Sequence, residues 1–142
     1  MATCIKRCDK LVYCAFLCIT MSMFDEASSE RANQEAAERF AAAGLQVTGL
    51  GSFVESSDLV VARISPASIA AGVRSIVQQG ECDAVFVSCT SLRVLDIAPD
   101  LEAELGVPVV SSNMALIWHL LRLAGVDDEL PEHGRLFTRP LG

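Results

Sequence analysis

Four apolar runs, separated by stretches with helical periodicity, constrain the fold of this 142-residue chain more than any other feature. Each run is nearly continuous rather than alternating, which is typical of strands buried on both faces of a parallel sheet. The runs are residues 10–19, 45–50, 84–88 and 107–110. Because parallel strands require crossover connections, the sequence predicts a doubly wound, four-stranded, mainly parallel α/β sheet with helices on both faces.

Residues that favour helix ends support this alternation of strands and helices. Serine and asparagine side chains cap helix N-termini, proline suits the first helical turn, and glycine favours the C-terminal turn. The four predicted helices begin at Ser28 or Ser29, Ser65, Pro99 and Asn113, and they end at Gly44, Gly80, Gly106 and Gly125, respectively. Helices therefore follow or precede every predicted strand.

The chain is long enough for one domain with its own core, since 51% of its residues are hydrophobic and 20% are charged. Within that single domain we distinguish a divergent N-terminal segment with the first strand (1–22), the α/β region (23–126) and a polar C-terminal tail (127–142). The apolar stretch 11–23 is shorter than the roughly 20 residues of a membrane span and lacks a clear signal-peptide cleavage site. We expect a cytoplasmic protein without membrane contacts.

The net charge of -7 argues against a nucleic-acid partner. Phosphate binding requires clustered Lys and Arg side chains, and the eleven basic residues form no extended run. We therefore expect no nucleic acid among the partners of this chain.

The cysteines near the N-terminus leave two alternatives open. Cys4 and Cys8, and likewise Cys14 and Cys18, form Cys-x3-Cys pairs that could supply four thiolates to a zinc ion. The usual short spacing is Cys-x2-Cys, however, and a free cysteine also packs as a small hydrophobic residue. We favour the structural role, in reduced form, and predict no metal and no cofactor.

Cys89 is the candidate reactive residue, because it follows the buried run 84–88 at the point where a helical pattern is predicted to begin. A thiol at a helix N-terminus meets backbone N–H groups and the positive end of the helix dipole, which favour the thiolate. Hydroxyl and amide groups of Ser88, Thr90 and Ser91 could bind a carboxylate and stabilise an enolate-like charge. Alternatively, Cys89 is a core residue, and Thr90 and Ser91 are helix caps that bind nothing.

The predicted sheet places further polar residues near Cys89. Ligands of open α/β sheets bind beyond the carboxyl ends of the strands, where the strand order reverses. With an order of 2-1-3-4, Cys89 borders that point, and residues 111–113 follow the last strand at the same edge, although helix capping also explains them. The glycine-containing stretch 49–58 lies on this edge as well and could act as a lid.

Three stretches of sequence resemble a known family. They are Phe86-Val87-Ser88-Cys89-Thr90-Ser91-Leu92-Arg93, Pro108-Val109-Val110-Ser111-Ser112-Asn113 and Trp118-His119-x-x-Arg122-Leu123-Ala124-Gly125. Together with Ala62-Arg63-Ile64-Ser65-Pro66, they are similar to the aspartate/glutamate racemase superfamily, and most of all to its maleate cis-trans isomerase branch, which includes arylmalonate decarboxylase. The resemblance covers about residues 25–126.

The resemblance implies both an architecture and a chemistry. Members of this family are about twice as long and consist of two similar halves that face each other across a cleft, with one cysteine from each half. This chain resembles the second half, so Cys89 corresponds to the second cysteine, and the neighbouring Ser88, Thr90 and Ser91 are the candidate substrate-binding residues. The implied activity is a cofactor-independent isomerisation or racemisation of a small (di)carboxylic acid, in which a second copy or a complementary half-domain would supply the facing side.

A second hypothesis is an inactive racemase-fold remnant or a small-carboxylate binding module. No residue of this chain corresponds to the first cysteine of the family, the loop at 20–26 has no tyrosine, and Leu59-Val60-Val61 replaces an expected asparagine. Cys82 is expected at the opposite end of the strand from Cys89. A decarboxylation needs only one proton donor, so it would tolerate these losses better than a racemisation.

Overall fold

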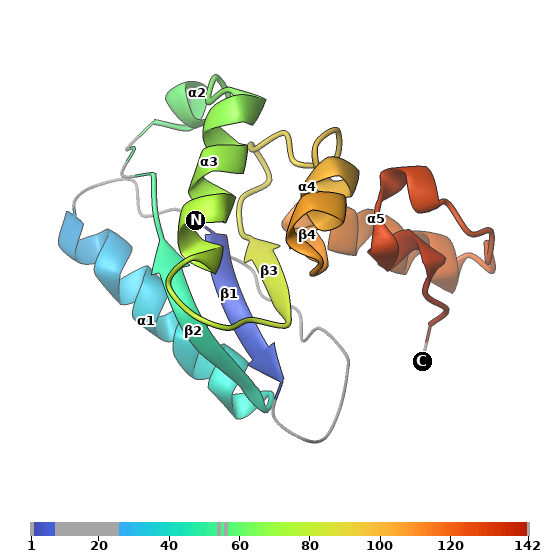
Figure 1. The fold of residues 1–142 in the computed structure, drawn as a ribbon, viewed down its shortest axis with the longest axis horizontal. Helices are drawn as coiled ribbons and strands as arrows, with labels where there is room; N and C mark the ends of the chain where they lie inside the picture. Colours follow the sequence, from blue (N-terminus) through green and yellow to red (C-terminus); the bar gives the residue numbers. More distant parts are fainter. Residues whose placement is uncertain (1, 8–25, 54, 56, 142) are drawn as a thin grey trace.

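A computed structural model describes residues 2–7, 26–53, 55 and 57–141, and it contains one four-stranded sheet with the strand order β2-β1-β3-β4 (Figure 1). The strands are β1 (Ala2–Arg7), β2 (Leu45–Gly51), β3 (Ala84–Val87) and β4 (Val109–Ser111). The helices are α1 (Glu26–Ala42), α2 (Asp58–Val61), α3 (Pro66–Val77), α4 (Ala98–Leu105) and α5 (Ser112–Leu123), followed by the short 3-10 helices η1 (Pro131–His133) and η2 (Arg135–Thr138).

The strand order is the one assumed from the sequence, but the strand in the β1 position is not the predicted one and runs in the opposite direction to the others. β1 comprises Ala2–Arg7 and pairs antiparallel with both β2 and β3. The first strand predicted at 10–19 lies outside the described residues. Since β3 and β4 pair in parallel, β2, β3 and β4 all run in one direction. The Ala2–Arg7 segment was missed because its Thr, Lys and Arg interrupt the apolar run that marks a central strand.

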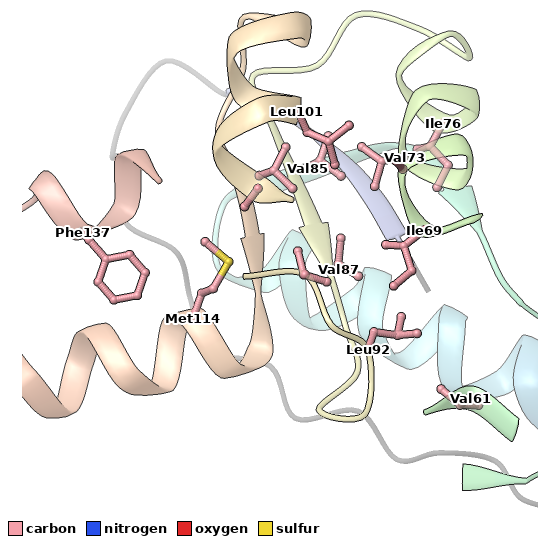
Figure 2. Packing of buried hydrophobic residues seen from close by; sticks show 14 residues of the cluster. Val61, Ile69, Val73, Ile76, Val85, Val87, Leu92, Leu101, Met114 and Phe137 are labelled. Atoms are coloured by element: carbon pink, nitrogen blue, oxygen red, sulfur yellow. The ribbon is translucent and has the colours of Figure 1, made fainter. Parts of the chain in front are cut away.

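Helices cover both faces of the sheet, as predicted. Side chains alternate between the faces along a strand, so Val85 and Val87 of β3 join one core while Phe86 joins the other. The first core contains Ile69 and Val73 of α3 and also residues of α4 (Figure 2). The second contains Ala36, Phe40 and Val110, and the rings of Phe40 and Phe86 meet edge to face at 5.8 Å.

The predicted helix ends are partly confirmed. Ser65 caps α3, since its hydroxyl accepts a hydrogen bond of 3.1 Å from the Ser68 amide, and Pro66 occupies the first turn. Gly106 follows α4 with a φ of 76°, a conformation that glycine adopts without steric cost. α1, however, begins at Glu26, so Ser28 and Ser29 lie within the helix and do not cap it.

The C-terminal segment 127–141 packs into the domain through the buried side chain of Arg122. Arg122 is 5% exposed, and its guanidinium donates hydrogen bonds to four backbone carbonyls. The acceptors are Val126 at 2.6 Å, Phe137 at 2.6 Å, Arg139 at 2.9 Å and Asp128 at 3.2 Å. The Phe137 ring points toward Met114 of α5 and is buried in the first core (Figure 2). This polar tail is therefore part of the packed structure.

Glu102 of α4 provides a second anchor for the same segment. Its buried carboxylate accepts hydrogen bonds from the backbone N–H of Val109 at 2.9 Å and of Arg135 at 2.8 Å. Gly134 precedes Arg135 with a φ of 108°, and an added Cβ there would come within 3.3 Å of the Glu102 carboxylate. One carboxylate thus joins the start of β4 to the start of η2.

We predict that Arg122→Met lowers the free energy of unfolding by about 2–4 kcal/mol, because buried carbonyls lose their donor and the tail loses its anchor. Chemical denaturation followed by circular dichroism measures this change. The matched control is Arg63→Met, an exposed arginine, for which the expected change is within about 0.5 kcal/mol. Equal effects of the two substitutions would contradict the anchoring role of Arg122.

Candidate functional site

Cys89 lies two residues beyond the end of β3, at the edge of the sheet where the three codirectional strands have their carboxyl ends. Its side chain is half-buried and packs against the first core. The backbone N–H of Ser91 donates a hydrogen bond to the Cys89 sulfur at 3.4 Å. The predicted position of Cys89 at a strand end is thus confirmed, with one backbone amide directed at the sulfur.

The predicted helix directly after Cys89 is wrong. Residues 88–97, termed here the Cys89 loop, contain turns at 90–91 and 95–97 but no helix, and α4 begins only at residue 98. Leu92 and Val94 are both buried in the first core, and this spacing of two suits an extended segment rather than a helix. No helix dipole acts on Cys89 from this side, so its polar environment comes from local backbone groups such as the Ser91 amide.

The three hydroxyl residues around Cys89 differ in accessibility. Thr90 is exposed and Ser91 is half-buried, so both can meet a ligand, whereas neither caps a helix as the alternative interpretation suggested. Ser88 is only 2% exposed, and its hydroxyl forms no hydrogen bond with the part of the chain that is described. The structure therefore leaves Thr90 and, in part, Ser91 accessible to a ligand and buries Ser88.

Asn113 connects the Cys89 loop to α5. Its side-chain amide donates a hydrogen bond of 2.8 Å to the carbonyl of Thr90. The predicted cap at Asn113 is therefore incorrect, since α5 begins at Ser112 and the hydroxyl of Ser111 accepts the capping hydrogen bond from Met114 at 3.3 Å. Because residues 111–113 are all polar, the sequence alone did not show which of them caps the helix. The bond from Asn113 to Thr90 depends on the path of the Cys89 loop, which brings the Thr90 carbonyl within reach.

The remaining site predictions have mixed outcomes. Gly49 and Gly51 belong to β2, so the loop that was expected to act as a lid begins at residue 52, and residues 54 and 56 are not described.

The side chains of the four N-terminal cysteines lie outside the described residues. Elsewhere, the described side chains include no group of three His, Cys, Asp or Glu that could hold a metal ion.

Cys82 is disulfide-bonded, which departs from the reduced thiols expected of a cytoplasmic chain. Cys89 is a free cysteine. Disulfides are more typical of oxidising compartments than of the cytosol, so the cytoplasmic location stays a prediction. Within the described parts of the chain, no helix has the length and apolar character needed to cross a membrane.

Comparison with known sequences identifies relatives from the family branch that the sequence resembles. A sequence model of the arylmalonate decarboxylase family matches residues 19–137. Arylmalonate decarboxylase of Bordetella bronchiseptica is 36% identical over 107 residues, which are 74% of this chain and 45% of that protein. The chain therefore spans about half the length of the curated relative that it matches.

Solved structures share the fold. A glycine-to-cysteine mutant of arylmalonate decarboxylase in a sulfate-associated form has a TM-score of 0.69 at 34% identity, and it covers 76% of this chain and 47% of that one. A Nocardia farcinica maleate cis-trans isomerase mutant, with a covalently bound succinylcysteine intermediate, has a TM-score of 0.68 at 22% identity, covering 77% of this chain and 44% of that one. These structures confirm the predicted half-length α/β fold of the racemase type.

We predict that Asn113→Ala loosens the Cys89 loop, because it removes the hydrogen bond to Thr90. One such bond contributes about 0.5–1.5 kcal/mol, so hydrogen exchange at the amides of the loop should accelerate roughly two- to tenfold. Mass-spectrometric hydrogen exchange of peptides covering 88–97 measures this effect. Ser112→Ala, the neighbouring control, should leave the exchange unchanged, and unchanged exchange in Asn113→Ala would exclude a positioning role.

Proposed function

Because the chain belongs to the arylmalonate decarboxylase family, we propose that it carries out a cofactor-independent decarboxylation of a 2-substituted malonate at Cys89. The observation that carries this proposal is the free, half-buried thiol at the sheet edge, with the Ser91 amide directed at its sulfur. The family match over residues 19–137 includes Cys89, the Cys89 loop and the polar residues 111–113 after β4. The proposed activity is that of a complete two-sided site, because this chain spans only about half the length of the curated relative.

A single cysteine can support this reaction. The bond between the α-carbon and one carboxylate breaks and releases carbon dioxide, and its electron pair passes into the remaining carboxylate to form an enediolate. The Cys89 S–H then donates its proton to the α-carbon, and the thiolate recovers a proton from water. One proton is consumed in each turnover, so no second cysteine on the opposite face is needed, unlike in a racemisation.

Groups of the Cys89 loop would stabilise the charge of the substrate. The remaining carboxylate becomes more negative as the enediolate forms, and N–H and O–H donors aimed at it lower the barrier. Thr90 is exposed and Ser91 is half-buried, so both could supply such donors to a substrate at Cys89. The Ser88 side chain is buried, and its hydroxyl has no hydrogen-bond partner among the described residues, so it would meet a substrate only if the Cys89 loop moved.

A cis-trans isomerisation of maleate is the second candidate. It is favoured by the shared fold with the isomerase mutant that carries a succinylcysteine intermediate. In this reaction the Cys89 thiolate would add to one alkene carbon, and the π electrons would move toward the neighbouring carboxylate. Rotation about the resulting single bond and expulsion of the thiolate would then give the trans isomer, without net uptake of a proton.

We expect phenylmalonate to lose carbon dioxide in the presence of the protein, and Cys89→Ser to lower this rate at least 100-fold, because serine is a far weaker proton donor. Proton NMR of the products measures both this reaction and the conversion of maleate. Ser75→Ala on the exposed side of α3 serves as the control and should keep the full rate. Thermal unfolding of each variant establishes that the fold is retained.

Three outcomes would count against parts of this proposal. Equal turnover by the wild type and by Cys89→Ser would exclude Cys89 as the proton donor. Conversion of maleate but not of phenylmalonate would favour the isomerase. If neither substrate reacts while both perturb the NMR signals of the Cys89 loop, the protein is a carboxylate-binding module and the enzyme proposal is wrong.

A further inference from the structure

Among the described residues, Ser88 carries the one buried side-chain oxygen or nitrogen that lacks a hydrogen-bond partner. Ser88 is only 2% exposed, so bulk water does not reach this hydroxyl. A buried hydroxyl without a partner lowers the stability of a fold, and such groups are rare in native proteins. Alanine would fill nearly the same space without this cost. The Ser88 hydroxyl is therefore available to a partner that the described chain does not provide.

Ser111, a second buried serine close to Ser88, uses its hydroxyl within the fold. β3 and β4 lie side by side with Val87 opposite Ser111 (Figure 1). Ser111 is 1% exposed, and its hydroxyl accepts the capping hydrogen bond of 3.3 Å from the Met114 N–H. The two serines thus share burial and position, and they differ in whether the chain satisfies the hydroxyl.

Two contacts hold Ser88 against the first turn of α5. Directly before Ser88, Val87 pairs with Ser111, the residue that caps this helix. Two residues after Ser88, the Thr90 carbonyl accepts the hydrogen bond of 2.8 Å from the Asn113 side chain. Ser88 lies between these two contacts, so it is a neighbour of the start of α5.

The alternation of side chains along β3 gives the direction of the Ser88 side chain. Val87 and Cys89 pack with the first core, whereas Phe86 packs with the second. Ser88 is therefore directed to the side of the second core. Ala115, near the start of α5, packs against that same core. The Ser88 hydroxyl thus points to the side on which α5 begins.

The first turn of α5 offers a second donor for an anion. The first N–H groups of a helix have no acceptor within the helix, and together with the helix dipole they attract anions. α5 comprises twelve residues, and its Ser111 cap accepts a hydrogen bond from the Met114 N–H. The Asn113 N–H is left without an acceptor inside the helix.

The charges of the adjoining segments also favour an anion. The chain has a net charge of -7, but residues 84–95 and 105–126 contain neither Asp nor Glu, and Arg93 lies in the first of these segments. A carboxylate between Ser88 and Asn113 would therefore meet two hydrogen-bond donors and no acidic side chain from either segment.

We propose that the Ser88 hydroxyl and the Asn113 N–H form a subsite for one carboxylate next to Cys89. In the proposed decarboxylation, on which the identity of the ligand rests, this subsite holds the carboxylate that the substrate retains and that becomes more negative as the enediolate forms. Because the hydroxyl is enclosed, the carboxylate reaches it only when the Cys89 loop opens. The bond from the Asn113 side chain to Thr90 keeps that loop closed.

Binding of malonate tests the subsite, because malonate carries two carboxylates without a substituent. NMR titration of ¹⁵N-labelled protein measures its affinity whether or not the protein decarboxylates it, with sodium chloride at equal ionic strength as the reference. We expect the Asn113 amide signal to shift with malonate. Ser88→Ala should weaken binding about 10-fold or more, because it removes a hydrogen bond to a charged group. Unchanged affinity in Ser88→Ala would overturn the subsite.

The matched control is Ser111→Ala, and the two serine variants should change stability in opposite directions. Ser88→Ala should raise the thermal midpoint by about 2–6 °C, because it removes an unpaired buried hydroxyl, whereas Ser111→Ala should lower it by a similar amount, because α5 loses its cap. Ser111→Ala should retain the affinity for malonate. A lower midpoint for Ser88→Ala would mean that its hydroxyl stabilises the unliganded fold, which contradicts the proposal.

A pair of variants at Asn113 isolates the backbone donor. Asn113→Ala and Asn113→Pro both lose the bond to Thr90, but only the proline variant also loses the N–H, and the first turn of a helix tolerates proline. Asn113→Ala should bind malonate at least as tightly as the wild type, because the Cys89 loop opens more readily. Asn113→Pro should bind it about 10-fold more weakly than Asn113→Ala. Equal affinities of the two variants would contradict the role of the N–H.

Failure of the subsite and failure of the proposed function are distinguishable. Binding of malonate that depends on Ser88, without any reaction of phenylmalonate, would contradict the decarboxylation and support the subsite. Turnover of phenylmalonate by Ser88→Ala with unchanged kcat and KM would contradict the subsite and support the decarboxylation.

Discussion

The burial of β3 on both of its faces is the constraint on which the rest of the structure depends. Val85 and Val87 join the core under α3 and α4, while Phe86 packs against Phe40 of α1. A shift of β3 by one residue would move each of these side chains to the opposite core and separate Phe86 from Phe40. This register determines where the strand ends. Cys89 consequently emerges at the carboxyl edge of the sheet, half-buried rather than enclosed.

Stability and the candidate site are linked through the two buried polar anchors. Arg122 and Glu102 hold the C-terminal segment against α4 and α5 with hydrogen bonds to backbone groups. The same helix α5 carries Asn113, which holds the Cys89 loop at Thr90. Residues far from Cys89 therefore keep its loop in place, because they fix the helix to which the loop is tethered.

The proposed decarboxylation needs one proton donor, and Cys89 is a free, half-buried thiol at the carboxyl edge of the sheet. In the proposed reaction, this thiol and the donors of the Cys89 loop act on one side of the substrate. Decarboxylase and isomerase structures share this fold, so the fold alone does not determine the substrate.

Local patterns in the sequence were sufficient for the strands β2, β3 and β4, for the Ser65 cap and for the position of Cys89 at a strand end, because each depends on neighbouring residues and on burial of a continuous apolar run. Long-range contacts account for what the sequence did not reveal. The antiparallel β1, the turns that replace a helix after Cys89, the bond from Asn113 to Thr90 and the packed C-terminal segment all depend on partners distant along the chain. A hydrogen bond between residues 23 positions apart leaves no periodicity in the sequence, so only the folded chain shows it.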